Sequence, residues 1–469
     1  MSRAISRYLA PIYLTLCLLL GGASAAGFLA NCALQLIGLL CILTVVLSGS
    51  LPVLPRPARL LLCLFGAAAA LLLFELLPLP PFLWQLLPGR GVEAQGYALL
   101  GMSAPWLPVT LSPDGTLSAL ASLIPPVAMI LLVYASSGYG RLFSVYALVA
   151  IAILSILLGL FQRMQGPDSP YYIYEVTNLG GVVGFFANRN HLATLLLTTL
   201  PFVSALAVSP KRNAKQDESK VGRLMITCCM GLLIAVGILV VKSAAGWMLL
   251  PPTLFAGVAI FLRGESGVVP RPVLQIGTLL CVVCVIASIA VPIKSNDLGD
   301  KLSGIDPHMR NQSIRTTAAA SLHYLPFGSG GGTFTRVYPE YENAENASLE
   351  YLNHAHDDYV EVALEHGLPG IALIVAAFIF WLTLVRQVWA RERGDALARA
   401  GSIAVGLIFA HSIVDYPLRT AAIAAVAALA ASLMVAPESA EMPNWQSTRR
   451  QRRKRGKSAR TIDISVTNR

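Results

Sequence analysis

The feature that most constrains this chain is a succession of apolar segments, each long enough to cross a bilayer as a helix. They recur from residue 8 to residue 436, and a helix of about 20 residues spans the hydrocarbon core of roughly 30 Å. Of the 469 residues, 55% are hydrophobic and 13% are charged, whereas about a quarter of a soluble chain is charged. The sequence therefore predicts an all-α polytopic membrane protein.

The apolar segments predict one helical bundle over residues 1–436 with about 12 transmembrane helices. Their expected ranges are 8–24, 28–48, 60–77, 118–135, 142–162, 191–208, 224–241, 246–262, 273–293, 369–385, 400–414 and 420–436. A long, ordered periplasmic loop, residues 294–368, is expected between helices 9 and 10, with smaller periplasmic segments at 78–117 and 163–190. Residues 437–469 form a basic cytoplasmic tail that we expect to be disordered.

The basic residues indicate the orientation of this bundle. They concentrate in alternate short loops and in the tail segment 449–460, which by the positive-inside rule places both termini in the cytoplasm. All seven histidines then lie on or near the outer face. A basic tail after the last span typically contacts anionic headgroups, so membrane lipids, and not nucleic acid, are the partners that the net charge of +10 predicts.

The segment 353–370, NHAHDDYVEVALEHGLPG, closes the long loop and combines histidines with carboxylates at a membrane edge. Ionisable groups in such a place point to function. Three interpretations remain open. One histidine is a general base oriented by a carboxylate, or His354, His356, Asp357 and Asp358 bind a divalent metal, or Asp357 or His356 simply caps a helix. Asp357, Glu361 and Glu365 are expected to form that helix's polar stripe.

The long loop also contains Arg310, Arg315 and the glycine run at 326–334, PFGSGGGTF. The glycine run either offers backbone N–H groups to an anion or is a flexible turn. Acidic residues outnumber basic ones in this loop, so an anion would have to be held by individually placed guanidinium groups, whose planar fork suits phosphate oxygens.

Taken together, these motifs resemble those of the O-antigen ligases and related polysaccharide polymerases. Nine residues separate His356-Asp357 from the Gly367-Leu-Pro-Gly370 ending, as in that family's signature. GFFANRNHLA at 184–193, Arg310 followed by the glycine run, and the segment His411 to Asp415 are similar to its other motifs.

Two positions depart from that family's pattern. Asp357 stands where the ligases usually have Asn, Ser or Gln, and Lys242 occupies a hairpin where relatives often show Ser-Arg.

The resemblance implies a membrane glycosyltransferase on the periplasmic face of the bacterial inner membrane. It implies a donor glycan on undecaprenyl diphosphate, lipid A–core or a growing polysaccharide as acceptor, and neither cofactor nor metal. His356 is the candidate base, and Arg310 and Arg189 are the candidates for stabilising the leaving diphosphate. The residues expected to bind the donor or support the site are Arg315, His191, His354, Asp357 and Lys242. The alternatives are a repeat-unit polymerase of the same superfamily, a lipid or polysaccharide transporter, and a non-catalytic membrane scaffold.

Overall fold

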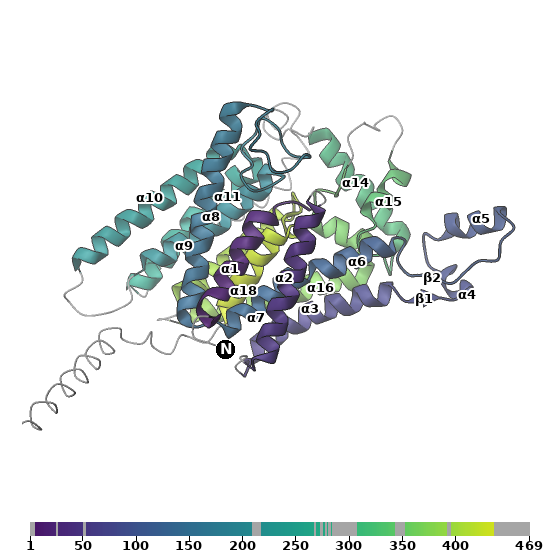
Figure 1. Cartoon of the computed structure of the whole chain (residues 1–469), viewed down its shortest axis with the longest axis horizontal. Helices are drawn as coiled ribbons and strands as arrows, with labels where there is room; N and C mark the ends of the chain where they lie inside the picture. Colours follow the sequence, from purple (N-terminus) through teal and green to yellow (C-terminus); the bar gives the residue numbers. More distant parts are fainter. Residues whose placement is uncertain are drawn as a thin grey trace, which may run out of the picture.

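The computed structural model describes residues 5–24, 27–49, 53–208, 217–266, short stretches between 269 and 283, 307–342, 352–391 and 395–435. The described part is almost entirely helical (Figure 1). The first half contains α1 (Ile5–Leu20), α2 (Phe28–Leu47), α3 (Arg56–Glu75), α4 (Pro81–Trp84), α5 (Gly91–Leu99), α6 (Pro113–Ser122), α7 (Ile124–Ala135) and α8 (Gly138–Gln165). The second half contains α9 (Arg189–Ala207), α10 (Asp217–Val241), α11 (Ala244–Ser266), α14 (Pro307–Tyr324), α15 (Phe334–Tyr341), α16 (Asp358–Ala390), α17 (Ala396–His411), the 3-10 turn η1 (Pro417–Arg419) and α18 (Ala421–Val435).

Eight of the described helices are long and apolar enough to cross a membrane, with α6 and α7 counted as one span, and α1, α17 and α18 are shorter apolar helices. The protein is thus a multi-pass membrane protein, as predicted. The expected number of 12 transmembrane helices is not confirmed. The predicted helix at 273–293 falls almost entirely outside the described residues, as do the tail and parts 294–306 and 343–351 of the long loop.

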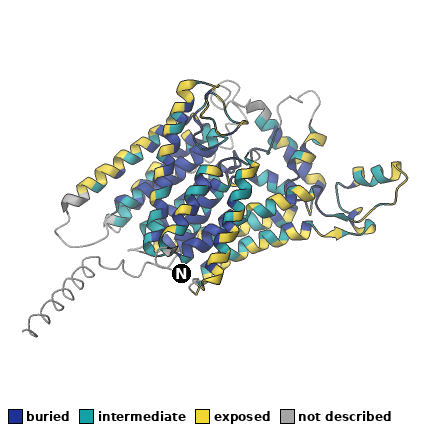
Figure 2. Ribbon diagram, in the orientation of Figure 1, coloured by how far each residue is buried: buried dark blue, intermediate teal, exposed yellow. Residues whose placement is uncertain are grey.

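The core of the bundle surrounds α9, of whose apolar window 83% is buried. This helix packs against α8, α10, α11 and α17. The corresponding windows of α2, α3 and α16 are 22%, 17% and 11% buried, so these helices expose broad apolar faces (Figure 2). Lipid tails can cover such faces without the free-energy cost that contact with water would impose.

Close packing at the end of the chain depends on small residues. A Cβ atom at Gly401 of α17 would lie 2.4 Å from the carbonyl oxygen of Ala430 in α18. Small side chains of this kind let two membrane helices approach closely. The tight α17–α18 pair fixes the turn between them, residues 412–420, which carries part of the polar site described below.

The proline- and tryptophan-rich segment after α3 extends away from the bundle (Figure 1). Its ends are joined by the antiparallel strands β1 (Pro78–Leu79) and β2 (Leu107–Pro108), with α4 and α5 between them. Apolar side chains such as Leu86 and Leu99 are 79% and 87% exposed there. The segment therefore presents an apolar surface outside the helical core.

Candidate active site

A polar centre forms where α9 and α18 begin, α17 ends and α16 begins. Helix α16 starts at Asp358, just after the segment that contains His354 and His356. The side chain of His356 is 6% exposed, and its Nδ1 lies 3.6 Å from Oδ1 of the fully buried Asp415. That distance is slightly longer than a hydrogen bond, and catalytic contacts in ligand-free proteins often tighten only with substrate. The φ angle of His356 is +59°, a left-handed conformation that costs a non-glycine residue about 1–3 kcal/mol and is concentrated at functional sites.

Asp415 is the carboxylate around which this centre is organised. Its Oδ1 accepts a hydrogen bond from the Tyr416 backbone N–H at 2.9 Å and lies 3.9 Å from Nε2 of His191. Burial raises the pKa of the Asp415 carboxyl, but the interaction with His356 and the charges of His191 and Arg310 bring it well below its ordinary value. Asp415 is therefore a carboxylate positioned to orient the His356 ring and to stabilise its protonated form.

Asp357 does not take this role, although it is the sequence neighbour of His356. Its Oδ1 accepts the backbone N–H groups of Tyr359 and Val360 at 2.9 and 3.1 Å, which is the geometry of an N-cap on α16. Burial raises the pKa of Asp357 to about 6, even though these two N–H groups lower it. Between the two sequence interpretations, the geometry favours the cap for Asp357 and gives the orienting position to Asp415.

Three histidine rings surround the phenol ring of Tyr416, which is 8% exposed. The ring centroids of His354, His356 and His191 lie 4.3, 5.0 and 5.1 Å from that of Tyr416. Burial raises the pKa of the Tyr416 hydroxyl, and the Asn188 side chain that N-caps α9 is its hydrogen-bond partner. Tyr416 thus links the start of α9 to residues 354–356.

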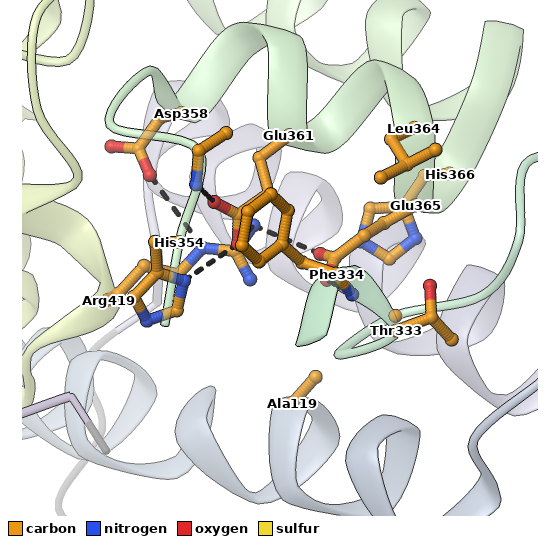
Figure 3. A network of polar contacts seen from close by, with 12 residues as sticks. Ala119, Thr333, Phe334, His354, Asp358, Glu361, Leu364, Glu365, His366 and Arg419 are labelled. Atoms are coloured by element: carbon orange, nitrogen blue, oxygen red, sulfur yellow. Dashed lines mark hydrogen bonds and ion pairs between the residues drawn. The ribbon is translucent and has the colours of Figure 1, made fainter. Parts of the chain in front are cut away.

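Arg419 holds a cluster of carboxylates next to this centre (Figure 3). Its guanidinium nitrogens lie 3.0 Å from Glu365, 3.2 Å from Glu361 and 3.7 Å from Asp358. Burial lowers the pKa of Arg419, but the three carboxylate charges raise it above its usual value. Glu361 also contacts Nδ1 of His354 at 2.7 Å. The network therefore fixes residues 354–356 to the first two turns of α16.

The predicted polar stripe of α16, Asp357, Glu361 and Glu365, is buried and not solvated. They are 9%, 0% and 1% exposed. The sequence spacing does place them on one face of α16, but that face packs against the loops of the site. Arg419, far away in the sequence, supplies the cation that makes their burial tolerable.

Two arginines from the sequence prediction present guanidinium groups without hydrogen-bond partners among the described residues. In Arg310 the Nη2 atom is buried and unpaired, and in Arg189 both Nε and Nη2 are. Arg310 lies in the first turn of α14, and its charge lowers the pKa of both Asp357 and Asp415 against the larger, opposite effect of burial. Arg189 is the first residue of α9, directly after Asn188. Buried N–H donors of this kind suit the oxygens of an anionic ligand.

The other two predicted basic residues form no hydrogen bond or ion pair with the centre among the described residues. Arg315 lies in α14 and is exposed. Lys242 occupies the turn between α10 and α11, exposed and with a φ of +57°. Neither has a contact with Asp415 or His356 in the described part of the chain, so their expected role in donor binding stays a prediction.

In the first part of the glycine run, residues 328 to 331, the backbone N–H groups are not free to bind an anion. The backbone N–H groups of residues 328 to 331 each donate to a protein acceptor at 2.7–3.0 Å. Their acceptors, in order, are the carbonyl oxygens of Tyr324, Leu364 and Glu365 and the carboxylate of Glu75. The run is thus neither an anion site nor a loose turn at these positions, but a clasp that holds α14, α16 and α3 together.

The Gly-x-x-Gly ending of the histidine segment serves the same clasp. Gly367 interrupts α16 with a φ of +56°, and a Cβ atom there would lie 2.3 Å from the carbonyl oxygen of Pro326. His366, beside it, places Nδ1 2.7 Å from the second oxygen of Glu75. Only glycine combines this backbone angle with this approach.

Sequence reasoning missed Glu75, Tyr416 and Arg419. Glu75 is a lone carboxylate in the apolar run of α3, which is itself a signal of function in a membrane segment. Tyr416 follows directly after the His411–Asp415 motif, and Arg419 is a single charge just before the last apolar run. No signal in the sequence pairs Arg419 with residues of α16.

The metal interpretation receives no geometric support within the described ranges. No group of three or more His, Cys, Asp or Glu side chains is arranged there to hold a metal ion. The four residues considered for it face different partners, because His354 contacts Glu361, His356 faces Asp415, Asp357 caps a helix, and Asp358 accepts from Ser412.

Residues 229–375 match the family model described as O-antigen ligase. The match includes Arg310, the glycine run and the histidine segment, whereas Arg189, Asp415 and Arg419 lie outside it. No curated protein matches the chain. For this matched segment of the multi-pass membrane protein, the resemblance to the O-antigen ligase-like superfamily that the motifs indicate is thereby confirmed.

Proposed function

We propose that the protein is a membrane glycosyltransferase of the O-antigen ligase type. It transfers a glycan from undecaprenyl diphosphate to an acceptor hydroxyl, on lipid A–core or a growing polysaccharide, at the periplasmic face of the bacterial inner membrane. Both termini are then cytoplasmic, as the distribution of basic residues favours. The observation that carries the proposal is a buried His356 facing the Asp415 carboxylate. Arg310, whose Nη2 atom has no partner among the described residues, is close enough for its charge to lower the pKa of Asp415.

His356 acts as the general base in this proposal. With Nδ1 directed at Asp415, its Nε2 takes the proton of the acceptor hydroxyl while that oxygen attacks the anomeric carbon of the donor. The bond between that carbon and the diphosphate oxygen breaks, and undecaprenyl diphosphate leaves with the electron pair. The negative charge of Asp415 stabilises the imidazolium that forms.

Arg310 and Arg189 stabilise the leaving diphosphate. Arg310 Nη2 and Arg189 Nε and Nη2 are buried and have no partner among the described residues, which leaves them available to phosphate oxygens. A positioned donor of this kind typically lowers a barrier by about 3–4 kcal/mol. No general acid is required, because a diphosphate is a stable anion and leaves without being protonated.

The test is transfer by the purified protein in lipid nanodiscs, supplied with a lipid-linked oligosaccharide and lipid A–core. We expect His356→Ala to abolish transfer while the variant still inserts and folds. His323→Ala is the matched control, because His323 is exposed on α14 and, among the described residues, its ring packs against the Tyr341 ring and not against the polar centre. Wild-type activity in His356→Ala would exclude the proposed base.

The products of the same assay separate a ligase from a repeat-unit polymerase. A single adduct on lipid A–core indicates a ligase, and a ladder formed from the donor without that acceptor indicates a polymerase. Appearance of the lipid-linked substrate on the opposite leaflet, with no new glycosidic bond, would instead indicate a transporter.

A further inference from the structure

A cavity of about 500 Å³ lies between α2, α6 and the start of α18. Its walls come from residues 28–35, 117–125 and 418–424, together with Ser24. The apolar lining residues Phe28, Leu117 and Leu418 are 71%, 52% and 38% exposed. Because α2 and the α6–α7 pair are candidate membrane spans, this apolar rim faces lipid and the cavity is accessible from the bilayer.

Inside the rim, the lining is polar and poorly satisfied. The Oδ1 atom of Asn31 is buried and accepts no hydrogen bond from the described residues, while its amide nitrogen donates to the Ala23 carbonyl oxygen at 3.4 Å. The side chains of Ser24, Gln35 and Ser118 also line the cavity; Ser118 is exposed, Ser24 and Gln35 are half-buried, and none of the three side chains is hydrogen-bonded to another described residue. A buried acceptor without a partner is costly, and beside accessible hydroxyl and amide groups it indicates a polar ligand.

The charge of the lining indicates what kind of polar ligand fits. Arg419 is the only charged side chain among the described lining residues, and it is already bound to Asp358, Glu361 and Glu365. The wall therefore offers no free cation to a diphosphate. Hydroxyl and amide groups without partners are instead matched by a ligand with many neutral hydroxyl groups.

We propose that this cavity binds the saccharide of a membrane-anchored glycolipid, the acceptor of the transfer reaction; this identification as acceptor rests on the proposed function. The apolar rim contacts the lipid part, and Asn31, Gln35 and Ser118 bind sugar hydroxyls. Arg419, which lines the cavity, also contacts Glu361. Glu361 in turn accepts the backbone N–H of Ala355, the residue before His356, at 2.8 Å. The acceptor thus approaches the candidate base from the α2–α6 side.

A native cysteine allows binding to be measured without transfer. Cys32 lines the cavity, and Cys63 is an exposed cysteine of α3 outside it. The protein in nanodiscs is treated with N-ethylmaleimide, and alkylation of each cysteine is followed by peptide mass spectrometry. Octyl glucoside at ten times its Kd should slow alkylation of Cys32 by about tenfold, because mass action leaves roughly one cavity in eleven empty. Cys63 should react at an unchanged rate.

Octanol and farnesyl diphosphate are the competing probes. The double variant Asn31→Leu/Gln35→Leu should lose the protection, whereas Thr44→Leu, a polar-to-apolar change elsewhere on α2, should keep it. Protection by octanol or farnesyl diphosphate equal to that by octyl glucoside, or no protection by any probe, would overturn the saccharide site. His356→Ala should retain full protection, so a failure of the catalytic proposal is distinguished from a failure of this one. In the transfer assay, the double variant should raise the KM for acceptor and leave the KM for donor unchanged.

Discussion

The contact between His356 and Asp415 allows a quantitative prediction. In the proposed mechanism His356 takes the acceptor proton, and its new positive charge then lies 3.6 Å from the Asp415 carboxylate. At an effective dielectric constant of about 20, two unit charges at that distance attract each other by about 4–5 kcal/mol. The substitution Asp415→Asn removes this attraction and keeps the side-chain shape, including an oxygen for the Tyr416 N–H. Since each 1.36 kcal/mol corresponds to a factor of ten in rate, kcat should fall by about 10³-fold.

The assay is single-turnover transfer in nanodiscs with saturating donor and acceptor, so that the chemical step is observed and not substrate binding. Asp357→Asn is the matched control, because it neutralises the adjacent carboxylate while asparagine remains a good N-cap for α16. We expect the control to retain activity within a few-fold of wild type. Loss of less than tenfold in Asp415→Asn, or an equal loss in the two variants, would refute the assignment of Asp415 as the orienting carboxylate.

Other variants test the surroundings of the site. Arg419→Met should reduce the free energy of unfolding by about 3–5 kcal/mol at pH 8, because the buried carboxylates of Glu361 and Glu365 lose their cation. This loss of stability should be smaller at pH 5, where the carboxylates become protonated. A loss no larger than that caused by the exposed Arg315→Met would contradict the network. Since burial raises the pKa of Asp357 to about 6, ionising it penalises the folded state as the pH rises from about 4 to 6. Asp357→Asn should therefore gain stability over wild type across that interval, by up to roughly 3 kcal/mol, and a pH-independent difference in thermal unfolding would argue against it. Gly367→Ala should cost about 3 kcal/mol or more, because its Cβ would collide with the Pro326 carbonyl oxygen at an unfavourable φ; a normal unfolding transition would disprove the clasp. EDTA should leave transfer unchanged, and loss restored by one divalent ion would revive the metal interpretation.

How far the sequence leads depends on the range of each interaction. The membrane helices are predictable because their signal is local: an uninterrupted apolar run satisfies its own backbone and requires lipid around it. The capping of α16 by Asp357 is local too, and was among the interpretations that the sequence left open. The pairing of His356 with Asp415 is not, since the two residues are brought together only when α17 packs beside the start of α16.

The glycine run illustrates the other limit. Its composition offers backbone N–H groups, but whether a ligand or the protein accepts them depends on Glu75 and on the carbonyl groups of the α16 kink. The same holds for Glu361 and Glu365, whose spacing alone cannot distinguish a solvated face from a buried one. Burial of like charges on one helix becomes favourable only once Arg419 is in place.

The distribution of the centre along the chain has a consequence for biogenesis. Asn188, Arg310 and His356 are synthesised well before Asp415 and Arg419, which precede the final helix. Until α17 and α18 insert, the carboxylates of α16 have no cation and His356 has no oriented partner. In the proposed mechanism, a ribosome-bound or truncated chain ending before residue 411 therefore cannot turn over donor, and catalytic competence arises only after α17 and α18 are in the membrane.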